Sequence, residues 1–310
     1  MPPMSWSEAS LLEWLGRRGR PRGLVGSQGH DSAVLRELDG RPVVCCDHVI
    51  EGVHAEPGTD GRWLGRKAAG RALSDLAASA ARPRALLCAL AAPRATSERR
   101  LQRVIEGVHE KAREHGAELV GGDLSSTRGP LTLSVTALGV QSTRGRPPGR
   151  DRARPGELVL VTGPLGGSRA GRHLDPAPRF AEAEFLCAGG ARVLMDVSDG
   201  LALDLARLAR ASRVRIELEH VPAHPDARRA ARRDGRSARR HALEDGEDHE
   251  LLATLAPARW RALAVRAARR FPALSVIGRV RAGHGLWLVP EGGGAPEPWD
   301  GRGGWLHGRR

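Results

Sequence analysis

The chain has 310 residues and a formal net charge of +13, with 49 Lys and Arg against 36 Asp and Glu. Lysine occurs only at Lys67 and Lys111, so nearly all of the positive charge is arginine. Together with many Gly and Pro and no Tyr, this bias indicates coding composition rather than a selected nucleic-acid surface, and we expect no nucleic-acid partner.

The N-terminal sequence and the apolar runs argue against a membrane protein. Residues 1–15 lack a basic segment followed by an apolar one. The longest apolar run, 85–93, is far below the roughly 18 residues that span a bilayer. The sequence therefore predicts a soluble, cytoplasmic protein with no membrane partner.

The four cysteines also argue against two kinds of site. Cys45, Cys46, Cys88 and Cys187 form no C-x-x-C pair, and two adjacent cysteines do not suit tetrahedral zinc. We expect neither a structural zinc nor a disulfide framework, which fits a reducing cytoplasm.

Strand-like and helix-like segments alternate along the chain. Apolar, β-prone runs predict strands at 42–47, 85–92, 131–140, 157–162, 192–197, 214–221, 249–255 and 285–289. Apolar spacing of three and four predicts helices at 62–81, 97–116, 201–212 and 257–271. The aperiodic, Gly-, Pro- and Arg-rich segment 141–155 is the expected boundary between two α/β domains, at 1–150 and 151–310.

Two C-terminal segments need separate interpretations. The Arg-rich segment 226–240 is interpreted as a solvated helix surface, since it contains no aromatic residue to stack on nucleic-acid bases. The Gly/Pro-rich segment 291–310 carries Trp299 and Trp305. Large aromatic side chains predict that this segment docks onto the rest of the protein.

Six aspartates stand in short motifs spread along the chain, and most directly follow a strand-like run or begin a helix-like one. They are Asp31, Asp47, Asp75, Asp123, Asp196 and Asp199. Carboxylates at element ends can converge on hard cations, and hard cations beside glycine-rich backbone are typical of phosphate-transfer sites. The pattern predicts an enzyme that uses Mg2+ and ATP.

Each motif alone also has a structural interpretation. Ser198 or Asp199 could cap the helix predicted from residue 201, or could hold phosphate and metal. Gly121-Gly122-Asp123 could let backbone N–H groups approach a phosphate, or could be a turn between helix and strand. The loop 163–171 lacks the Gly-Lys-Ser/Thr ending, so it is not a P-loop.

Taken in order, the motifs resemble those of the thiamine-monophosphate kinase family, within the aminoimidazole-ribonucleotide-synthetase-like superfamily. The resemblance extends from about residue 26 to residue 307. Its specific parts are D-H-V-I-E-G-V-H at 47–54, L-S-D at 73–75, G-G-D at 121–123, V-T-G at 161–163, D-V-S-D-G-L at 196–201 and G-E-D-H-E-L at 246–251.

The resemblance implies a fold and an activity. The fold is a two-domain α/β (α+β) architecture in which N-terminal β-structure forms the core of a homodimer. The activity is direct transfer of the γ-phosphoryl group of ATP onto thiamine monophosphate, giving thiamine diphosphate, with several Mg2+ ions. Because an acceptor phosphate is already ionised, no catalytic base or nucleophile is expected, and the ions offset the repulsion between the two anions.

The resemblance also implies roles for single residues. The metal ligands correspond to Asp31, Cys46, Asp47, Asp75, Asp123, Asp196 and Asp199. The ATP contacts correspond to Gly121, Gly122, Arg150 and Ser198, and the substrate contacts to His54, Glu247 and Trp305. A lone histidine such as His54, or an acidic residue at the start of a strand such as Glu247, also fits a purely structural role.

The chain departs from the family pattern at several positions. His30 stands where the family has a second aspartate, Cys45 and Cys46 where it has hydroxyl residues, and Ala72 where it has Asn. His249 replaces a Tyr, and Gly308 replaces a Phe after His307. A thiol is a poorer Mg2+ ligand than a hydroxyl, but all six carboxylates are present, so the pattern favours an active kinase.

Two alternatives remain open. One is another ATP-dependent enzyme of the superfamily with a different acceptor. A selenophosphate synthetase would need a reactive Cys and a Lys near the N-terminus, whereas the first of each here is Cys45 and Lys67. The other is a catalytically vestigial, Arg-rich RNA-binding relative, which would bind RNA in a strongly salt-dependent way.

Overall fold

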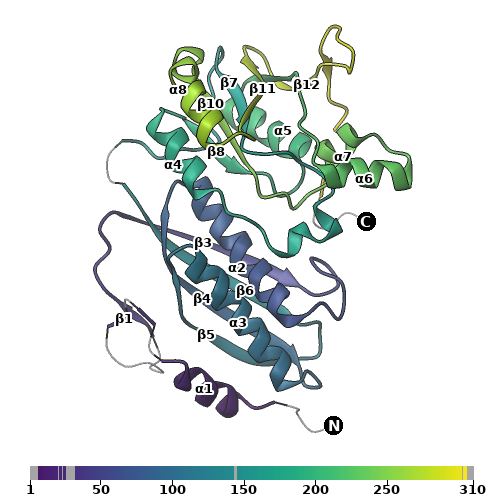
Figure 1. Ribbon diagram of the computed structural model, residues 1–310. Helices are drawn as coiled ribbons and strands as arrows, with labels where there is room; N and C mark the ends of the chain where they lie inside the picture. Colours follow the sequence, from purple (N-terminus) through teal and green to yellow (C-terminus); the bar gives the residue numbers. More distant parts are fainter. Residues whose placement is uncertain are drawn as a thin grey trace. The chain divides into compact units, whose positions relative to one another are not determined.

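The computed structural model describes residues 6–19, 21–22, 24–25, 32–142, 145–301 and 303–305. The chain divides into two compact units (Figure 1). Unit 1 comprises Met1–Leu76, Ala81–Gly145 and Leu174–Pro176, and unit 2 comprises Ala77–Ala80, Arg146–His173 and Ala177–Arg310. The main division therefore falls between Gly145 and Arg146, inside the segment 141–155.

Unit 1 is built on a four-stranded sheet. Its elements are α1 (Glu8–Arg17), β1 (Leu24–Val25), β2 (Val34–Leu35), β3 (Arg41–Ile50), α2 (Gly61–Ala78), β4 (Arg82–Pro93), α3 (Glu98–Glu114), β5 (Glu118–Thr127) and β6 (Thr132–Gln141). The sheet order is β3-β6-β4-β5, with β4 and β5 parallel and the other neighbours antiparallel. The short strands β1 and β2 form a separate antiparallel pair.

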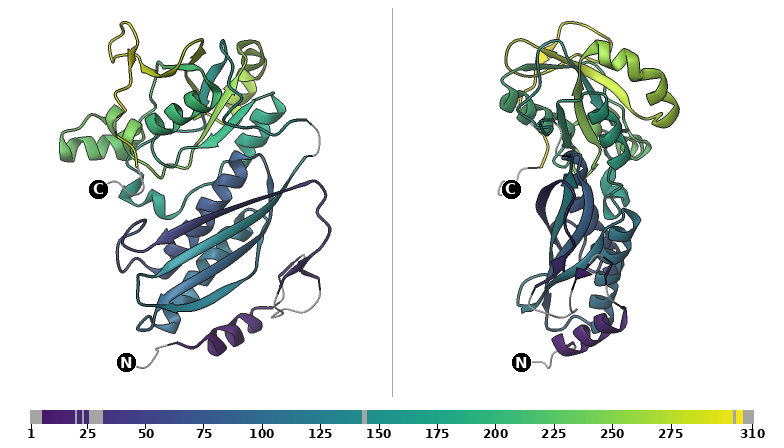
Figure 2. Two further views of the ribbon diagram at one scale, coloured as in Figure 1. Left: turned by 180° about the vertical axis from the view of Figure 1, so that it is seen from behind. Right: turned by 90° about the vertical axis from the view of Figure 1, so that its left-hand side faces the viewer.

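Helices α2 and α3 cover one face of this sheet (Figures 1 and 2). On β6, Leu133, Val135 and Ala137 are buried, whereas the alternate residues are only half-buried. Successive side chains of a strand point to opposite faces, so the buried set faces the helices. The opposite face of the sheet, which we call the open face, is left without a helix and exposes Val44 and Leu87.

Unit 2 is a seven-stranded mixed sheet with helices. Its strands are β7 (Leu158–Val161), β8 (Val193–Asp196), β9 (Arg215–Leu218), β10 (Leu251–Leu255), β11 (Ser275–Arg281), β12 (Gly285–Leu288) and β13 (Glu297–Pro298). Its helices are α4 (Phe180–Ala188), α5 (Leu201–Ser212), α6 (Pro225–Asp234), α7 (Ala238–Glu244) and α8 (Pro257–Arg270), with short 3-10 turns η1 (Ser168–Ala170) and η2 (Arg172–Leu174). The sheet order is β13-β12-β9-β11-β7-β10-β8, and only β12 and β9 pair in parallel.

Two apolar clusters fill the two faces of this sheet. On β7, Val159 and Val161 join a cluster that contains Leu201, Leu205 and Leu208 of α5. Leu158 and Leu160 join the other cluster, which contains residues of α4 and α8. A strand buried on both faces is apolar throughout, which explains why β7 has the sequence Leu-Val-Leu-Val.

All eight expected strands and all four expected helices are present, each within three residues of its predicted ends. The mixed α/β architecture is confirmed. The sequence patterns missed β5 and β11, since both are interrupted by Gly or polar residues. They also missed α1 and α4. The Arg-rich segment forms α6 and α7, and Arg228, Arg232 and Arg233 are exposed on α6, as expected of a solvated helix.

Within the part of the chain that the structure describes, no helix is both long enough and apolar enough to cross a membrane.

Candidate active site

In unit 1, two strands and one helix position three of the expected carboxylates. Asp47 lies within β3 rather than after it, and Asp123 lies within β5. Asp75 lies in the last turns of α2. Asp75 thus lies inside the helix expected at 62–81. Strand β3 continues for three residues past Asp47, and Asp123 lies in a strand that the apolar runs did not indicate, so these two aspartates do not stand at the ends of elements as expected.

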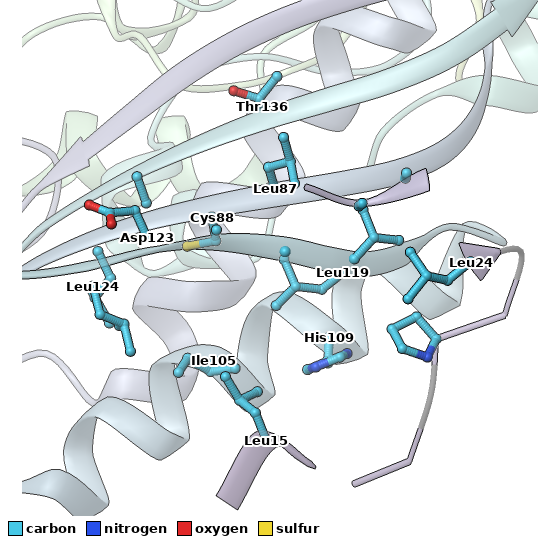
Figure 3. Close-up of a pocket in the computed structure, with 18 of the residues that line it drawn as sticks. Leu15, Leu24, Leu87, Cys88, Ile105, His109, Leu119, Asp123, Leu124 and Thr136 are labelled. Atoms are coloured by element: carbon cyan, nitrogen blue, oxygen red, sulfur yellow. The ribbon is translucent and has the colours of Figure 1, made fainter. Parts of the chain in front are cut away.

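The register of the sheet separates Asp47 from Asp123. Asp47 pairs with Val135, which pairs with Cys88, which pairs with Gly122. Paired residues share a face, so Asp47 is on the helix-covered face with Val135 and Cys88, and Asp123 follows on the open face. Figure 3 shows this division, with Asp123, Leu87 and Thr136 on one side of β5 and Ile105 and His109 on the other.

Gly121, Gly122 and Asp123 line a cavity of about 1390 Å³ in unit 1, together with Ser134 and Thr136 of β6. The Gly-Gly-Asp motif is part of a strand, so the turn interpretation is wrong. A Cβ atom on Gly122 would lie 1.9 Å from the carbonyl oxygen of Cys88. The close approach of β4 and β5 therefore requires a glycine at this position, whatever else the motif does.

A charged cluster lies between β3 and α2. The Arg71 guanidinium donates from Nε to Asp47 Oδ2 at 2.8 Å and from Nη2 to Asp47 Oδ1 at 3.0 Å. The neighbouring Cys45 thiol donates to the carbonyl oxygen of Ala72 at 3.1 Å. Burial raises the pKa of Cys45 to about 12, with a smaller contribution from the charges of Asp75 and Asp47, so both carboxylates lie near this thiol.

Cys46 is on the open face, away from Asp47. Its Sγ lies 3.2 Å from the hydroxyl oxygen of Ser134. Ser134 pairs with Ala89, and Ala89 pairs with Asp123, so Asp123 lies on the same face. The two adjacent residues Cys46 and Asp47 therefore face opposite ways, since their strand is regular here.

In unit 2, Asp196 ends β8, and the tight turn from β8 to α5 carries Ser198 and Asp199. The Asp204 carboxylate accepts hydrogen bonds from the backbone N–H groups of Ser198 and Asp199, both at 3.1 Å. Neither Ser198 nor Asp199 caps α5, because Gly200 occupies the cap position without a side-chain bond. The turn is instead held from inside the first turn of the helix.

Asp204 and Arg207 complete this turn. Arg207 Nη1 donates to Asp199 and also to Asp204 Oδ1, the latter at 3.1 Å. Asp204 is only 2% exposed. Burial raises the pKa of its carboxyl to about 7, and the charge of Asp196 adds to the effect.

The Gly246–Glu250 segment lies against the same turn. The N–H of Glu247 donates to the Ser198 carbonyl at 2.7 Å, and the N–H of His249 donates to the Val197 carbonyl at 2.8 Å. Both Glu247 and His249 have positive φ, at 64° and 53°. A non-glycine residue in this region costs free energy, so the two backbone bonds hold a strained loop in place. His249 Nδ1 lies 3.3 Å from Asp196 Oδ2.

Asp248 and Glu250 of this segment have structural partners. Asp248 accepts from the N–H of Gly166, at 3.0 and 2.9 Å to its two oxygens, and from Arg172 Nη2 at 3.0 Å. Its burial raises its pKa to about 7. Glu250 accepts from the Thr162 hydroxyl at 2.6 Å and from Arg179. The loop 163–171 is therefore an anchor for the acidic segment, which agrees with its rejection as a P-loop.

The C-terminal segment reaches the same region of unit 2. The backbone N–H of Trp305 donates to the Asp199 carbonyl at 2.8 Å. Trp305 is 41% exposed, and the centroid of its ring lies 5.3 Å from the Arg169 guanidinium carbon. Glu247 Oε2 is 3.2 Å from His173 Nδ1 and 4.0 Å from Arg169 Nε. Unit 2 thus brings together Asp199, Glu247 and Trp305, which are 48 to 106 positions apart in the chain.

Three of the expected site residues are not tied to these clusters. His54 is buried, and its Nδ1 accepts from the N–H of Ile50 at 3.0 Å, so it closes the turn after β3. Arg150 is exposed, and its backbone carbonyl accepts from the Ser212 hydroxyl at 2.8 Å. Asp31 lies outside the described residues.

The metal ligands expected from the sequence are not assembled as a ready site. Within the described ranges, no group of three or more His, Cys, Asp and Glu side chains is placed so that it could hold a metal ion. Asp47 and Asp199 instead each hold an arginine. Carboxylate oxygens are ligands that suit Mg2+. In this structure an arginine guanidinium neutralises Asp47 and another neutralises Asp199, so both carboxylates are ionised donors of the kind that a divalent cation binds.

Sequence reasoning missed Arg71, Asp204 and Arg207. Arg71 and Asp75 are four residues apart on one helix, and Asp204 and Arg207 are three apart on another. Such spacing places side chains on one helix face, so helical periodicity gave a signal. It did not give their partners, since Arg71 bonds to a residue on a distant strand.

Comparisons with known proteins place these motifs in a family. A family model described as AIR synthase related protein, N-terminal domain, matches residues 29–141. The thiamine-monophosphate kinase of Rhodopirellula baltica is 36% identical over 294 residues, which is 90% of this chain and 91% of that protein.

Solved structures agree with this similarity. The thiamine-monophosphate kinase of Stenotrophomonas maltophilia superimposes with a TM-score of 0.78 at 31% identity, covering 90% of this chain and 94% of that one. The structure of AaThiL complexed with AMPPCP and TMP superimposes with a TM-score of 0.76 at 27% identity, covering 97% and 96%. The motifs, the fold and the identity over nine-tenths of the chain lead to one conclusion: the chain belongs to the thiamine-monophosphate kinase family.

Proposed function

We propose that the protein transfers the γ-phosphoryl group of ATP to thiamine monophosphate and releases thiamine diphosphate and ADP. The observation that carries the proposal is the meeting of Asp199, Glu247 and Trp305 in unit 2, in a chain whose relatives are thiamine-monophosphate kinases. AaThiL has been captured with AMPPCP and TMP, one nucleotide analogue and one second ligand. A direct transfer needs both compounds bound together.

In the proposed reaction, an oxygen of the substrate phosphate attacks the γ-phosphorus, and the bond from that phosphorus to the β-phosphate oxygen breaks. ADP leaves with the bonding electron pair. The attacking oxygen is already ionised, so no proton has to be removed and no general base is needed. The proposed step therefore requires carboxylates that hold cations, and it requires no nucleophile–base pair.

Mg2+ is the proposed cofactor, and when bound it would neutralise charge on both phosphates. The residues proposed to hold it are Asp31, Cys46, Asp47, Asp75, Asp123, Asp196 and Asp199. Gly121, Gly122, Arg150 and Ser198 are proposed to contact ATP. The cavity lined by Gly121, Gly122 and Asp123 supports a nucleotide site, since glycine backbone and a carboxylate line it together.

His54, Glu247 and Trp305 are proposed to contact thiamine monophosphate. The indole face of Trp305 suits the cationic thiazolium, and the Glu247 carboxylate suits a positive charge. The Arg169 guanidinium already lies over that indole, which supports its use as a cation-binding surface.

We also propose that the protein is a cytoplasmic homodimer, with residues 1–150 as the ATP-, Mg2+- and dimer-forming domain and residues 151–310 as the second domain. The open face of the unit 1 sheet supports this, since Val44 is 68% exposed and Leu87 is 42% exposed there. Exposed apolar side chains on an uncovered sheet face favour burial against a partner. Light scattering at micromolar concentration should give about twice the chain mass of 33.2 kDa, and Val44→Asp should shift the species toward monomer.

A chromatographic assay tests the activity. Protein, Mg2+, ATP and thiamine monophosphate are incubated, and thiamine diphosphate and ADP are both measured. Formation of the two products in equal amounts supports the proposal. ADP formed without thiamine diphosphate would indicate a different acceptor, and salt-dependent RNA binding without ADP release would indicate a vestigial RNA-binding protein.

A further inference from the structure

Arg71 forms a bidentate ion pair with the carboxylate of Asp47. Nε lies 2.8 Å from Oδ2 and Nη2 lies 3.0 Å from Oδ1. The pair is mostly shielded from solvent, with side-chain exposures of 12% for Arg71 and 24% for Asp47. A bidentate pair of this kind is among the stronger and more directional polar contacts in proteins.

The guanidinium therefore occupies coordination positions on Asp47. Oδ1 also accepts from the backbone N–H of His48 at 2.8 Å, so both of its lone-pair directions are used. Oδ2 keeps one direction that is not used by the Arg71 pair. A metal ion could therefore bind Oδ2 of Asp47 only next to the positive charge of Arg71, or it could displace the Arg71 guanidinium from the carboxylate.

Asp75 brings the second expected ligand to the same place. It follows Arg71 by four residues on α2, so the two side chains lie on one face of that helix. A thiol on β3, that of Cys45, bonds to α2 at Ala72 between them. Arg71 thus lies beside two carboxylates that would otherwise repel each other, which is the position a divalent cation would neutralise.

We infer that Arg71 is an internal counter-cation that competes with the divalent metal for Asp47 and so lowers the affinity of this metal site. The inference rests on the proposed metal role of Asp47. In the metal-free protein Arg71 is paired with both carboxylate oxygens of Asp47. Binding of the ion breaks the contact between the guanidinium and at least one of these oxygens. The same competition explains why these carboxylates do not form a ready metal site in the described residues.

A counter-cation differs from a positioning residue in the direction of its effect. Removing a residue that orients a ligand weakens metal binding, whereas removing a competitor tightens it. Arg71→Met removes the charge and retains a long side chain with good helix propensity. Arg62→Met is the matched control, since Arg62 is on the same helix and pairs with Glu110 instead, at 2.7 Å.

The experiment is a titration of nucleotide-free protein with Mn2+, an ion that accepts the same oxygen ligands as Mg2+, with free Mn2+ measured by electron paramagnetic resonance. Arg71→Met is expected to bind Mn2+ about 5- to 30-fold more tightly, the range that loss of one charge-assisted pair corresponds to. Arg71→Lys retains the positive charge but cannot form the bidentate guanidinium pair. Its Mn2+ affinity should lie between those of Arg71→Met and wild type. Arg62→Met should match wild type.

A second measurement separates competition from damage to the fold. Without metal, Arg71→Met should melt at a lower temperature than wild type, and saturating Mn2+ should raise its melting temperature by more than it raises that of wild type. If Arg71→Met does not fold, Arg71→Gln carries the same test with a neutral polar side chain.

Unchanged or weaker Mn2+ binding by a folded Arg71→Met or Arg71→Gln protein overturns the inference. Asp47→Asn identifies which idea has failed. If Asp47→Asn binds Mn2+ as wild type does, the metal role proposed for Asp47 is wrong. If Asp47→Asn loses a site but the Arg71 variants show no gain, only the role of Arg71 is wrong.

Discussion

Asp47 in unit 1 and Asp199 in unit 2 both pair with an arginine from a helix, but the backbone holds them in different ways. Asp47 lies within β3, where the ladder to β6 runs unbroken from Arg41 to Ile50. Asp199 lies in a turn and depends on other parts of unit 2: Asp204 accepts its N–H, and Trp305 donates to its carbonyl.

The difference teaches where each site should be sensitive. A strand residue is placed by many backbone bonds, so a single side chain elsewhere contributes little to its position. A turn residue is placed by a few bonds to side chains and to a distant segment. Substitutions outside the proposed ligands should therefore disturb the unit 2 turn more than the unit 1 strands.

The largest expected effect tests the strand-held side of the comparison. Asp123→Asn should lower kcat by at least about 100-fold, because a neutral amide does not balance metal and phosphate charge. Its melting temperature should change little, since Asp123 is an exposed residue within a paired strand. Thiamine diphosphate formation and thermal unfolding measure the two quantities.

The control for Asp123 is Asp39→Asn, which makes the same chemical change at an exposed position just before β3. It should retain wild-type kcat. An Asp123→Asn enzyme with more than about a tenth of wild-type kcat, a loss of under 1.4 kcal/mol in transition-state stabilisation, would contradict the proposed role.

The second prediction tests the turn-held side. Asp204→Ala leaves the N–H groups of Ser198 and Asp199 without their acceptor, so the free energy of unfolding should fall by about 1–3 kcal/mol. It should also lower kcat, because Asp199 loses its support. Urea denaturation and the kinase assay measure these effects. Loss of stability with full activity would show that the turn does not need Asp204 to place Asp199.

The same carboxyl predicts a pH dependence. The pKa of Asp204 is raised to about 7 in the folded protein, above its ordinary value near 3.8 in the unfolded chain. The folded protein therefore binds more protons between these values, and the contribution of Asp204 to stability is lost as pH rises from about 4 to about 7. Asp204→Asn should flatten this part of the stability profile, measured by urea denaturation at several pH values. An unchanged slope would show that Asp204 does not titrate in this range.

The third variant concerns the docked C-terminal segment. A cation over an indole contributes about 0.5–2 kcal/mol, so Trp305→Ala should raise KM for thiamine monophosphate by about 3- to 30-fold and leave KM for ATP nearly unchanged. Steady-state kinetics with each substrate varied in turn makes the comparison. If the melting temperature falls and both KM values rise alike, Trp305 only packs the segment, and Trp299 becomes the candidate aromatic.

The smallest effect is expected at Cys46. Cys46→Ser restores a hard oxygen donor on the open face and should lower the Mg2+ concentration for half-maximal activity by about two- to threefold. Cys187→Ser, on α4 in unit 2, is the control and should leave it unchanged. A rise in the Mg2+ requirement of Cys46→Ser would argue against a ligand role at this position.

Several features of the fold followed from local patterns. Apolar runs identified β7, β8 and β10, since a strand buried on both faces leaves a continuous apolar segment. Spacing of three and four identified α3 and α5. Strand β5 was missed because its glycines and polar residues do not resemble a buried strand, although its place beside β4 requires one of them, Gly122.

The sequence by itself determined the order of the motifs and therefore the family, because residue identity at fixed spacing is what a family shares. It also determined the chemistry available, a set of carboxylates suited to a hard cation. Only the tertiary structure decided which side chains meet: that Asp47 and Asp123 face opposite sides of one sheet, that Arg71 and Arg207 neutralise two of the carboxylates, and that Trp305 reaches Asp199. Strand register and the docking of distant segments depend on contacts between residues far apart in the chain, and periodicity within one segment contains no information about those contacts.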